Sequence, residues 1–306
     1  MKILVATDKP FAADAVNKIK LVVDNAGFEF LLLEKYTGKS QLLEAVKDVN
    51  AIIIRSDIID AEVLDSAKQL KIVVRAGAGY DNVDLDAATA HGVVVMNTPG
   101  QNSNAVAELV FGLMVYAARN QFDGNSGSEL MAKKLGIHAY GNVGRNVARV
   151  AKGFGMDVYA YDAFVPAGAI EKEGIKALAS AGELYATCQY VSLHIPATSE
   201  TKNSINYALL EKMPKKAVLI NTARKEVINE ADLLKFMEDR PDFKYLTDVM
   251  PSNDAELKAK FPQRYFSTPK KMGAQTSEAN NNAGIAAANQ IVEFFKNGDV
   301  RFQVNK

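Results

Sequence analysis

Short apolar runs alternate with amphipathic stretches along almost the whole chain. A first series of β-branched and aliphatic runs predicts strands at Lys2–Ala6, Glu29–Leu33, Ala51–Ile54, Lys71–Val74 and Val93–Met96. A second series predicts strands at Leu135–Ala139, Asp157–Tyr161, Tyr190–Leu193, Val218–Asn221, Tyr245–Asp248 and Tyr265–Thr268. Segments between them, such as Ala12–Ala26 and Leu42–Val46, carry apolar residues at helical spacing. This alternation is typical of βαβ units, so the sequence predicts an α/β fold with two doubly wound parallel sheets.

Two long helical patterns suggest how the two series are divided. An apolar helix at about Ala105–Arg119 lies between them, and a second at Glu278–Asn297 ends at Gly298, a candidate C-cap. If both helices are bridges, one domain comprises residues 1–97 plus 283–306 and the other residues 98–282.

Two segments carry turn residues without periodicity. They are Asp123–Ser128 and Pro251–Pro262, and we expect both to be loops.

Composition narrows the class of protein. The 306 residues are 48% hydrophobic and 24% charged, which excludes a disordered, collagen-like or disulfide-rich chain. Lys+Arg and Asp+Glu balance at 36 each, so charge gives no reason to expect a nucleic-acid or membrane partner. Cys188 is the single cysteine, and no metal site is predicted. The apolar stretch Ala105–Ala118 contains Glu108 and is too short to span a bilayer, and we expect a soluble cytoplasmic protein.

The first chemical signal is a glycine-containing turn after a predicted strand. Residues 139–144 read AYGNVG, a dinucleotide-binding turn with Ala139 in place of its first glycine. In such a turn, Gly141 lets the backbone approach a pyrophosphate and Gly144 lets the helix pack close to the strand. The residues expected at the cofactor are Tyr140, Gly141, Asn142, Val143, Gly144 and Arg145, the last as a positive charge near the phosphates.

An acidic residue at the next strand end sets the expected cofactor. Asp162 ends the strand that follows the turn, where a carboxylate accepts hydrogen bonds from both ribose hydroxyls and repels a 2′-phosphate. No Lys or Arg occurs in residues 163–170 to hold such a phosphate. NAD is therefore the predicted cofactor, and the alternatives are a glycine turn without a ligand and, in third place, NADP.

Five motifs in order make the chain similar to the D-2-hydroxyacid dehydrogenases over its whole length. They are RAGAGYDNVD at 75–84, NTPG at 97–100 with VAE at 106–108, the dinucleotide turn, SLHIP at 192–196 and NTAR at 221–224. The resemblance implies a Rossmann NAD-binding domain inserted into a flavodoxin-like substrate domain. Within the family the chain is most similar to short D-3-phosphoglycerate dehydrogenases, and we expect it to lack the serine-binding regulatory domain of the long forms.

The resemblance also implies roles for individual residues. It places the substrate carboxylate on the backbone N–H groups of Gly77, Ala78 and Gly79, with Asn102 at the same pocket. It places His194, Pro196, Thr201 and Thr222 beside the cofactor, and Asp248 at the nicotinamide carboxamide. His194 also has a simpler interpretation, as a structural loop histidine.

Arg224 is the strongest catalytic candidate. It follows a parallel strand, and its planar fork can hold the substrate carboxylate and polarise the carbonyl oxygen. The alternative is a surface arginine paired with Glu226 or Glu230.

The chain departs from the family at the expected acid–base pair. The family places a histidine after a Thr-Pro pair near the chain end and a glutamate five residues after the aspartate of the carboxamide strand. Here residues 268–274 read TPKKMGA and position 253 is Asn. Counting back from Gly273 places Lys271 where the histidine belongs, whereas counting forward from Pro269 selects Lys270. We favour Lys271 as the proton acceptor.

Arg55 and Ser56, at the end of a first-series strand, point to a phosphate on the substrate. The alternative is an exposed arginine paired with neighbouring Asp57. The resemblance implies NAD-dependent oxidation of 3-phospho-D-glycerate to 3-phosphohydroxypyruvate, and the phosphate site expected at Arg55 agrees with that substrate. The long apolar helix at Ala105–Arg119, together with the resemblance, implies a homodimer. Two other functions are compatible with the sequence, a glyoxylate or hydroxypyruvate reductase and a non-enzymatic NAD-sensing protein.

Overall fold

The computed structural model describes residues 1–305, and these form two compact units. Unit 1 comprises Met1–Asn102 with Gln275–Lys306, and unit 2 comprises Ser103–Ala274. The chain therefore changes unit at 102/103 and 274/275, whereas the sequence suggested 97/98 and 282/283. The shift has a physical reason, since each long helix stays whole: α5 (Ser103–Ala118) begins unit 2, and α12 (Ser277–Asn297) lies entirely in unit 1.

Unit 1 is built on a parallel sheet with the strand order β2-β1-β3-β4-β5. Its strands are β1 (Lys2–Thr7), β2 (Glu29–Glu34), β3 (Ala51–Ile54), β4 (Ile72–Arg75) and β5 (Val94–Asn97). This is the flavodoxin-like order that the sequence predicts, and each strand lies within one residue of its expected position.

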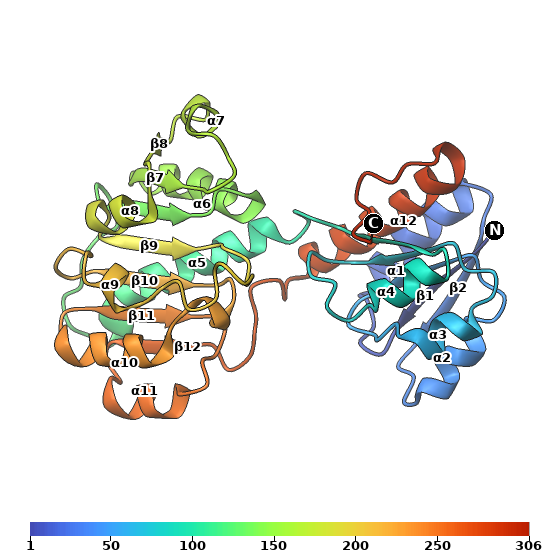
Figure 1. The fold of residues 1–306 in the computed structure, drawn as a ribbon, viewed down its shortest axis with the longest axis horizontal. Helices are drawn as coiled ribbons and strands as arrows, with labels where there is room; N and C mark the ends of the chain where they lie inside the picture. The colour runs from blue at the N-terminus through green and yellow to red at the C-terminus, as the bar shows by residue number, and fades with distance from the viewer. Residues whose placement is uncertain (306) are drawn as a thin grey trace. The chain divides into compact units, whose positions relative to one another are not determined.

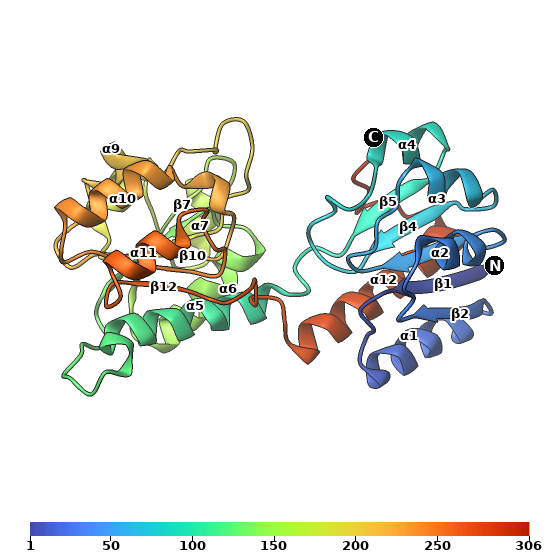
Figure 2. The same ribbon diagram turned by 90° about the horizontal axis from the view of Figure 1, so that it is seen from below.

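Helices cover both faces of the unit 1 sheet (Figure 2). α1 (Ala13–Asn25) and α12 pack on one face, and α2 (Lys39–Ala45), α3 (Ala61–Ser66) and α4 (Leu85–Ala90) on the other. Successive residues of a strand point to opposite faces of the sheet, so Ile3 packs in the core under α1 and α12 and Leu4 packs in the core on the other face. Gly298 ends α12 with a left-handed φ of 67°, as predicted for a C-cap.

Unit 2 carries a second parallel sheet, with the order β12-β11-β10-β9-β6-β7-β8 (Figure 1). Its strands are β6 (Lys134–His138), β7 (Asp157–Tyr161), β8 (Lys176–Ala177), β9 (Tyr190–Leu193), β10 (Val218–Asn221), β11 (Lys244–Thr247) and β12 (Tyr265–Ser267). The order is that of a dinucleotide-binding fold extended by one strand, and the chain reverses direction across the sheet between β6 and β9. β8 was not predicted because two residues are too short to show a periodic pattern.

Helices also cover both faces of the second sheet. α5 and α6 (Asn142–Gly153) share one core, and α8 (Ala181–Thr187), α9 (Tyr207–Leu210) and α10 (Glu230–Asp239) share the other. The remaining elements are α7 (Ala167–Lys172), α11 (Asp254–Lys260) and the short 3₁₀ turns η1 (Asn120–Phe122) and η2 (Lys225–Val227). None of the helices within residues 1–305 is long and apolar enough to cross a membrane.

One expected loop is partly helical. Asp123–Ser128 contains no helix or strand, as predicted, but Pro251–Pro262 contains α11, so the loop prediction there was wrong. Leu257 is the one buried residue of this helix, which is too little apolar signal for a periodicity argument. Ion pairs at helical spacing support it instead, joining Lys258 to Asp254 and Lys260 to Glu256.

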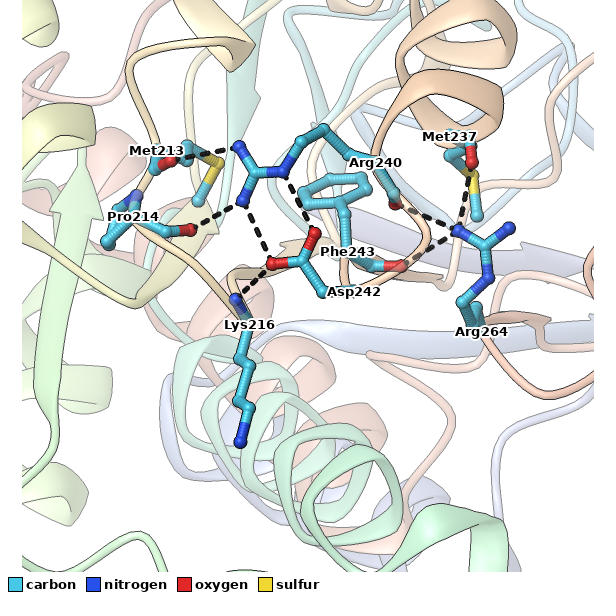
Figure 3. A network of polar contacts seen from close by, with 8 residues as sticks. All are labelled: Met213, Pro214, Lys216, Met237, Arg240, Asp242, Phe243 and Arg264. Atoms are coloured by element: carbon cyan, nitrogen blue, oxygen red, sulfur yellow. Dashed lines mark hydrogen bonds and ion pairs between the residues drawn. The ribbon is translucent and has the colours of Figure 1, made fainter.

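A network of hydrogen bonds and an ion pair joins the segments that precede β10 and β11 in unit 2 (Figure 3). The Arg240 guanidinium donates to both carboxylate oxygens of Asp242, at 2.9 and 3.0 Å, and to the backbone oxygens of Met213 and Pro214. The Lys216 N–H also donates to Asp242. These donors hold the pKa of Asp242 well below its ordinary value, Arg240 contributing most. Beside this network, Arg264 Nη1 donates to the Met237 and Arg240 carbonyls at the end of α10 and to the Phe243 carbonyl just before β11.

This network predicts a pH-dependent contribution to stability. Asp242→Asn should lower the free energy of unfolding at pH 7 by roughly 1–3 kcal/mol, because a charge-assisted pair is lost. Because the pKa of Asp242 is lower in the folded than in the unfolded protein, its ionised form stabilises the fold at pH values above the unfolded pKa of about 3.9. This stabilisation is lost progressively as the pH falls below that value toward the folded-state pKa. Urea unfolding at several pH values should therefore show the wild-type advantage shrinking below about pH 4. The control is Asp239→Asn, which changes an exposed carboxylate that accepts from the Tyr207 hydroxyl. If the stability difference between wild type and Asp242→Asn did not depend on pH, the stabilising role of the Asp242 charge would be contradicted.

Candidate functional site

Most of the predicted site residues of unit 2 lie just after the carboxyl ends of its strands. Residues 139–145 follow β6, Asp162 follows β7, and His194 and Pro196 follow β9. Thr222 and Arg224 follow β10, Asp248 follows β11, and Lys270 and Lys271 lie in the loop after β12. Because the strands are parallel, these loops share one edge of the sheet, which is where open α/β sheets bind ligands.

The turn after β6 has the close packing of a dinucleotide-binding turn. A Cβ on Gly144 would lie 2.5 Å from the Ala139 carbonyl oxygen and 3.0 Å from Ile137, so only glycine fits there. A Cβ on Gly141 would meet nothing within 4 Å, which leaves open space beside the backbone at the start of α6. Ala139 has a φ of 80°, which shows why a glycine is usual at this position.

Asp162 is fixed by backbone N–H groups on two loops. Its Oδ2 accepts from the Tyr140 N–H at 2.6 Å, and its Oδ1 accepts from the N–H groups of Phe164 and Val165 at 2.7 and 2.9 Å. The half-buried carboxylate therefore lies directly against the glycine turn. A carboxylate has about four acceptor sites, so capacity for a ribose hydroxyl remains.

Arg145 is engaged in a way that the sequence did not reveal. Its guanidinium forms an ion pair with Glu173 and lies 5.0 Å from the centre of the Tyr140 ring. Glu173 also accepts from the Tyr140 hydroxyl at 2.9 Å. The charge expected to serve a pyrophosphate is therefore balanced by a carboxylate, which leaves the N–H groups at the start of α6 as the principal anion donors.

None of the three histidines belongs to the loop that carries the lysines. His138 is buried on β6, and burial lowers its pKa to about 4. His194 Nε2 lies 2.9 Å from Ser192 Oγ, and burial followed by the nearby His138 lowers its pKa to about 3. His91, in unit 1, forms an ion pair with Asp65. Both histidines of unit 2 are thus neutral at pH 7 and poor proton acceptors.

The turn after β10 presents Thr222 and Arg224. The Asn221 side chain folds this turn by accepting from the Ala223 N–H and donating to the Arg224 carbonyl, both at 3.0 Å. Thr222 Oγ1 is buried and has no hydrogen-bond partner within residues 1–305. Arg224 is half-buried, and in the described part of the chain it pairs with neither Glu226 nor Glu230, which removes the simple surface interpretation.

The lysine-bearing loop is attached to the end of β11. Thr268 and Asp248 are both buried and hydrogen-bonded to each other at 2.8 Å, whereas Lys270 and Lys271 are exposed. Asn253, where the family places glutamate, precedes α11, and its Nδ2 donates weakly to the Glu230 carbonyl at 3.5 Å. After β9, Thr201 Oγ1 donates to the Pro196 carbonyl at 2.5 Å and so closes the loop that holds both residues.

In unit 1, Arg55 is held by neutral groups. Its guanidinium donates to the Lys9 and Pro10 carbonyls and to Asn280 Oδ1, at 2.8–3.1 Å, and lies over the Phe11 ring. Asp57 accepts from the Arg55 backbone N–H at 3.2 Å, and also from the Asp8 N–H and the Tyr36 hydroxyl. The Arg55 guanidinium does not donate to it, so the ion pair of the alternative interpretation is not formed. Ser56 is exposed beside it.

The glycine turn after β4 is shaped by an arginine that the sequence analysis did not select. The Arg75 Nε donates to the Arg55 carbonyl at 3.0 Å, and its guanidinium occupies the space beside Gly77, where a Cβ would clash. The Gly77 N–H donates to the Arg75 carbonyl, which leaves Ala78 and Gly79 as the anion donors of the predicted nest. Arg75 is the last residue of β4 and opens the RAGAG motif, so its position at a strand end was the available signal. Asn102 is half-buried at the end of this unit.

Known proteins resemble both the sequence and this geometry. Residues 111–270 match the NAD-binding domain of the D-isomer-specific 2-hydroxyacid dehydrogenases. A D-3-phosphoglycerate dehydrogenase of Methanocaldococcus jannaschii is 34% identical over 95% of the chain, and the chain spans 57% of that relative's length. A hydroxypyruvate reductase of Thermotoga maritima is 31% identical over 86% of the chain and is covered to 90%.

A solved structure is similar over its full length. The NAD⁺-bound 3-phosphoglycerate dehydrogenase of Entamoeba histolytica is 46% identical, with a TM-score of 0.88 over 100% of this chain and 99% of the other. The close packing at Gly144, the open space at Gly141 and the unpartnered Thr222 hydroxyl fit the same cofactor here.

The position of Asp162 predicts the cofactor preference. Wild type should use NAD with a kcat/KM at least about tenfold above that for NADP, since a 2′-phosphate would lie against the carboxylate. Asp162→Ala should narrow this gap, mainly by weakening NAD. Steady-state kinetics with both cofactors measures the ratio. Equal kcat/KM values in the wild type would refute the role of Asp162.

Proposed function

Because the chain belongs to the family of D-isomer-specific 2-hydroxyacid dehydrogenases, we propose that it oxidises 3-phospho-D-glycerate to 3-phosphohydroxypyruvate with NAD, the entry reaction of serine synthesis. The observation that carries this proposal is the full-length similarity to an NAD⁺-bound 3-phosphoglycerate dehydrogenase at 46% identity. Two cationic groups support it, Arg55 at the end of β3 and Arg224 at the end of β10.

The cofactor would be held by the loops described above. The N–H groups of Asn142 and Val143 would bind the pyrophosphate, and Asp162 would accept from the ribose hydroxyls. Thr222 supplies a hydroxyl that has no partner of its own within residues 1–305. When bound, NAD supplies the hydride acceptor of the reaction.

Lys271 and Arg224 would perform the proton and charge chemistry. Lys271 in its neutral form takes the proton of the substrate hydroxyl as the hydride leaves C2. Arg224 holds the substrate carboxylate and stabilises the negative charge that develops on the oxygen. A lysine needs no orienting carboxylate to select a tautomer, so asparagine at position 253 is compatible with this role.

Unit 1 would supply the groups that bind the substrate. Arg55 has N–H donors beyond those used by Lys9, Pro10 and Asn280, because a guanidinium carries five. With Ser56 it forms a donor pair suited to a phosphate, and the N–H groups of Ala78 and Gly79 are suited to the carboxylate.

A reductase acting on an unphosphorylated substrate is the second candidate. The similarity to a hydroxypyruvate reductase over most of both chains favours it. In this chain the two functions would differ in whether Arg55 binds a phosphate, and the same cofactor site, Arg224 and Lys271 would serve either.

A homodimer assembled through unit 2 is part of the proposal. Large apolar side chains are exposed on this unit near α5 and α6: Phe122 and Met131 are each 66% exposed and Phe154 is 40% exposed. Phe154 stacks on Phe111 of α5, and Phe122 contacts Tyr116 of the same helix. Such a surface is suited to a second copy of the chain.

The role of Lys271 can be separated from that of its neighbour. Lys271→Met should lower kcat by ~10²–10⁴ while the substrate KM is largely retained, because a general base acts in the chemical step. Lys270→Met is the matched control and should have a much smaller effect. A Lys271→Met variant that changes only KM would show that the lysine serves substrate binding instead.

The substrate class is tested by comparing 3-phospho-D-glycerate with D-glycerate. Wild type should prefer the phosphorylated acid, and Arg55→Ala should raise its KM by roughly 10–100-fold, as expected when a charged hydrogen bond is lost. The KM for D-glycerate should change little. If Arg55→Ala weakens both substrates equally, or if wild type prefers D-glycerate, the reductase proposal gains.

A further inference from the structure

Asp248 binds the lysine-bearing loop at three points. Its side chain is 1% exposed, and its Oδ1 accepts from Thr268 Oγ1 at 2.8 Å and from the Met272 N–H at 2.7 Å. Its Oδ2 accepts from the Gly273 N–H at 2.8 Å. All three donors belong to this loop, and two of them are backbone N–H groups.

The residues that donate these bonds flank the two lysines in the sequence. Thr268 lies before Lys270 and Lys271, and Met272 and Gly273 lie directly after them. A Cβ on Gly273 would lie 3.0 Å from Asp248 Oδ2 and 3.2 Å from Val106, so the loop approaches the carboxylate closely because this residue is glycine. The peptide group that follows Lys271 is therefore held in place, and Lys270 is one residue further from it.

We propose that Asp248 is a positioning residue that fixes the loop of residues 268–273 and thereby sets the place of Lys271. The proposal rests on the role proposed above for Lys271 and goes beyond the carboxamide contact that the family resemblance assigns to Asp248. Three of about four acceptor sites on the carboxylate are already used by the loop. At most one site remains for a cofactor amide, so holding the loop is the larger part of what this side chain does.

Hydrogen exchange of the cofactor-free protein tests the positioning without relying on activity. In Asp248→Asn an amide NH₂ group replaces one acceptor oxygen and faces an N–H donor of the loop. The amides of Met272 and Gly273 should then exchange at least about tenfold faster than in wild type. Asp232→Asn is the matched control, since that carboxylate accepts the Tyr207 N–H in the same unit, and it should leave the loop unchanged. Unchanged exchange in Asp248→Asn overturns the proposal.

A double-mutant cycle shows whether Asp248 acts through the lysine. If it does, Asp248→Asn lowers kcat by about tenfold or more in wild type and adds little to Lys271→Met. The proposal is overturned if Asp248→Asn raises only the NAD dissociation constant. It is also overturned if the decreases in kcat caused by Asp248→Asn and Lys271→Met multiply fully in the double mutant. If Lys271→Met alone leaves kcat unchanged, the catalytic role of the lysine fails, and the exchange experiment still decides whether Asp248 holds the loop.

Discussion

Hydrogen bonds from backbone N–H groups to two aspartates organise the ligand edge of unit 2. Where a chain leaves a parallel sheet, its N–H groups lose their ladder partners and need other acceptors. Asp162 accepts three such groups from the loops after β6 and β7, and Asp248 accepts two from the loop after β12. Each carboxylate thus fixes a loop that carries a proposed function, the cofactor turn in one case and Lys271 in the other. The proposed chemistry depends on these two anchors.

The lysine and asparagine that replace the family's histidine and glutamate are compatible with this arrangement. Asn253 Oδ1 is buried and accepts no hydrogen bond within residues 1–305. The position of the family's glutamate is therefore occupied by a neutral side chain with no specific acceptor role. A carboxylate near Lys271 would favour its ammonium form, which cannot accept a proton. The two substitutions are therefore physically consistent with each other.

The fold was largely predictable because strand and helix periodicities were strong. Fully buried strands such as Ala51–Ile54, an uninterrupted apolar run, and Val218–Asn221, an apolar run that ends in asparagine, were predicted with correct bounds. β8 and α11 were not predicted, since one has two residues and the other a single buried apolar side chain. The predicted domain boundary at 282/283 falls inside α12, whereas the chain passes from unit 2 to unit 1 at 274/275. Sequence periodicity does not show which unit such a long helix packs against.

The candidate site was predictable where a residue's chemistry depends on its position after a strand. Asp162 and Arg224 are such cases, and the motifs located both. Contacts between distant segments could not be predicted, as the pairing of Arg145 with Glu173 and of Arg55 with Asn280 shows. These partners come from different elements and follow no local spacing. The function of Asp248 as a loop anchor was missed for the same reason, since its donors lie 20–25 residues further along the chain.

We propose above that this chain transfers a hydride from C2 of a phosphorylated hydroxy acid to NAD. The most direct measurement uses 3-phospho-D-glycerate deuterated at C2, with the product cofactor analysed by NMR or mass spectrometry. The account predicts deuterium at C4 of the reduced nicotinamide, and 3-phosphohydroxypyruvate formed in equal amount. Reduced cofactor that contains no deuterium would contradict this hydride transfer. It would also be contradicted if 3-phospho-D-glycerate did not reduce NAD while unphosphorylated hydroxy acids did.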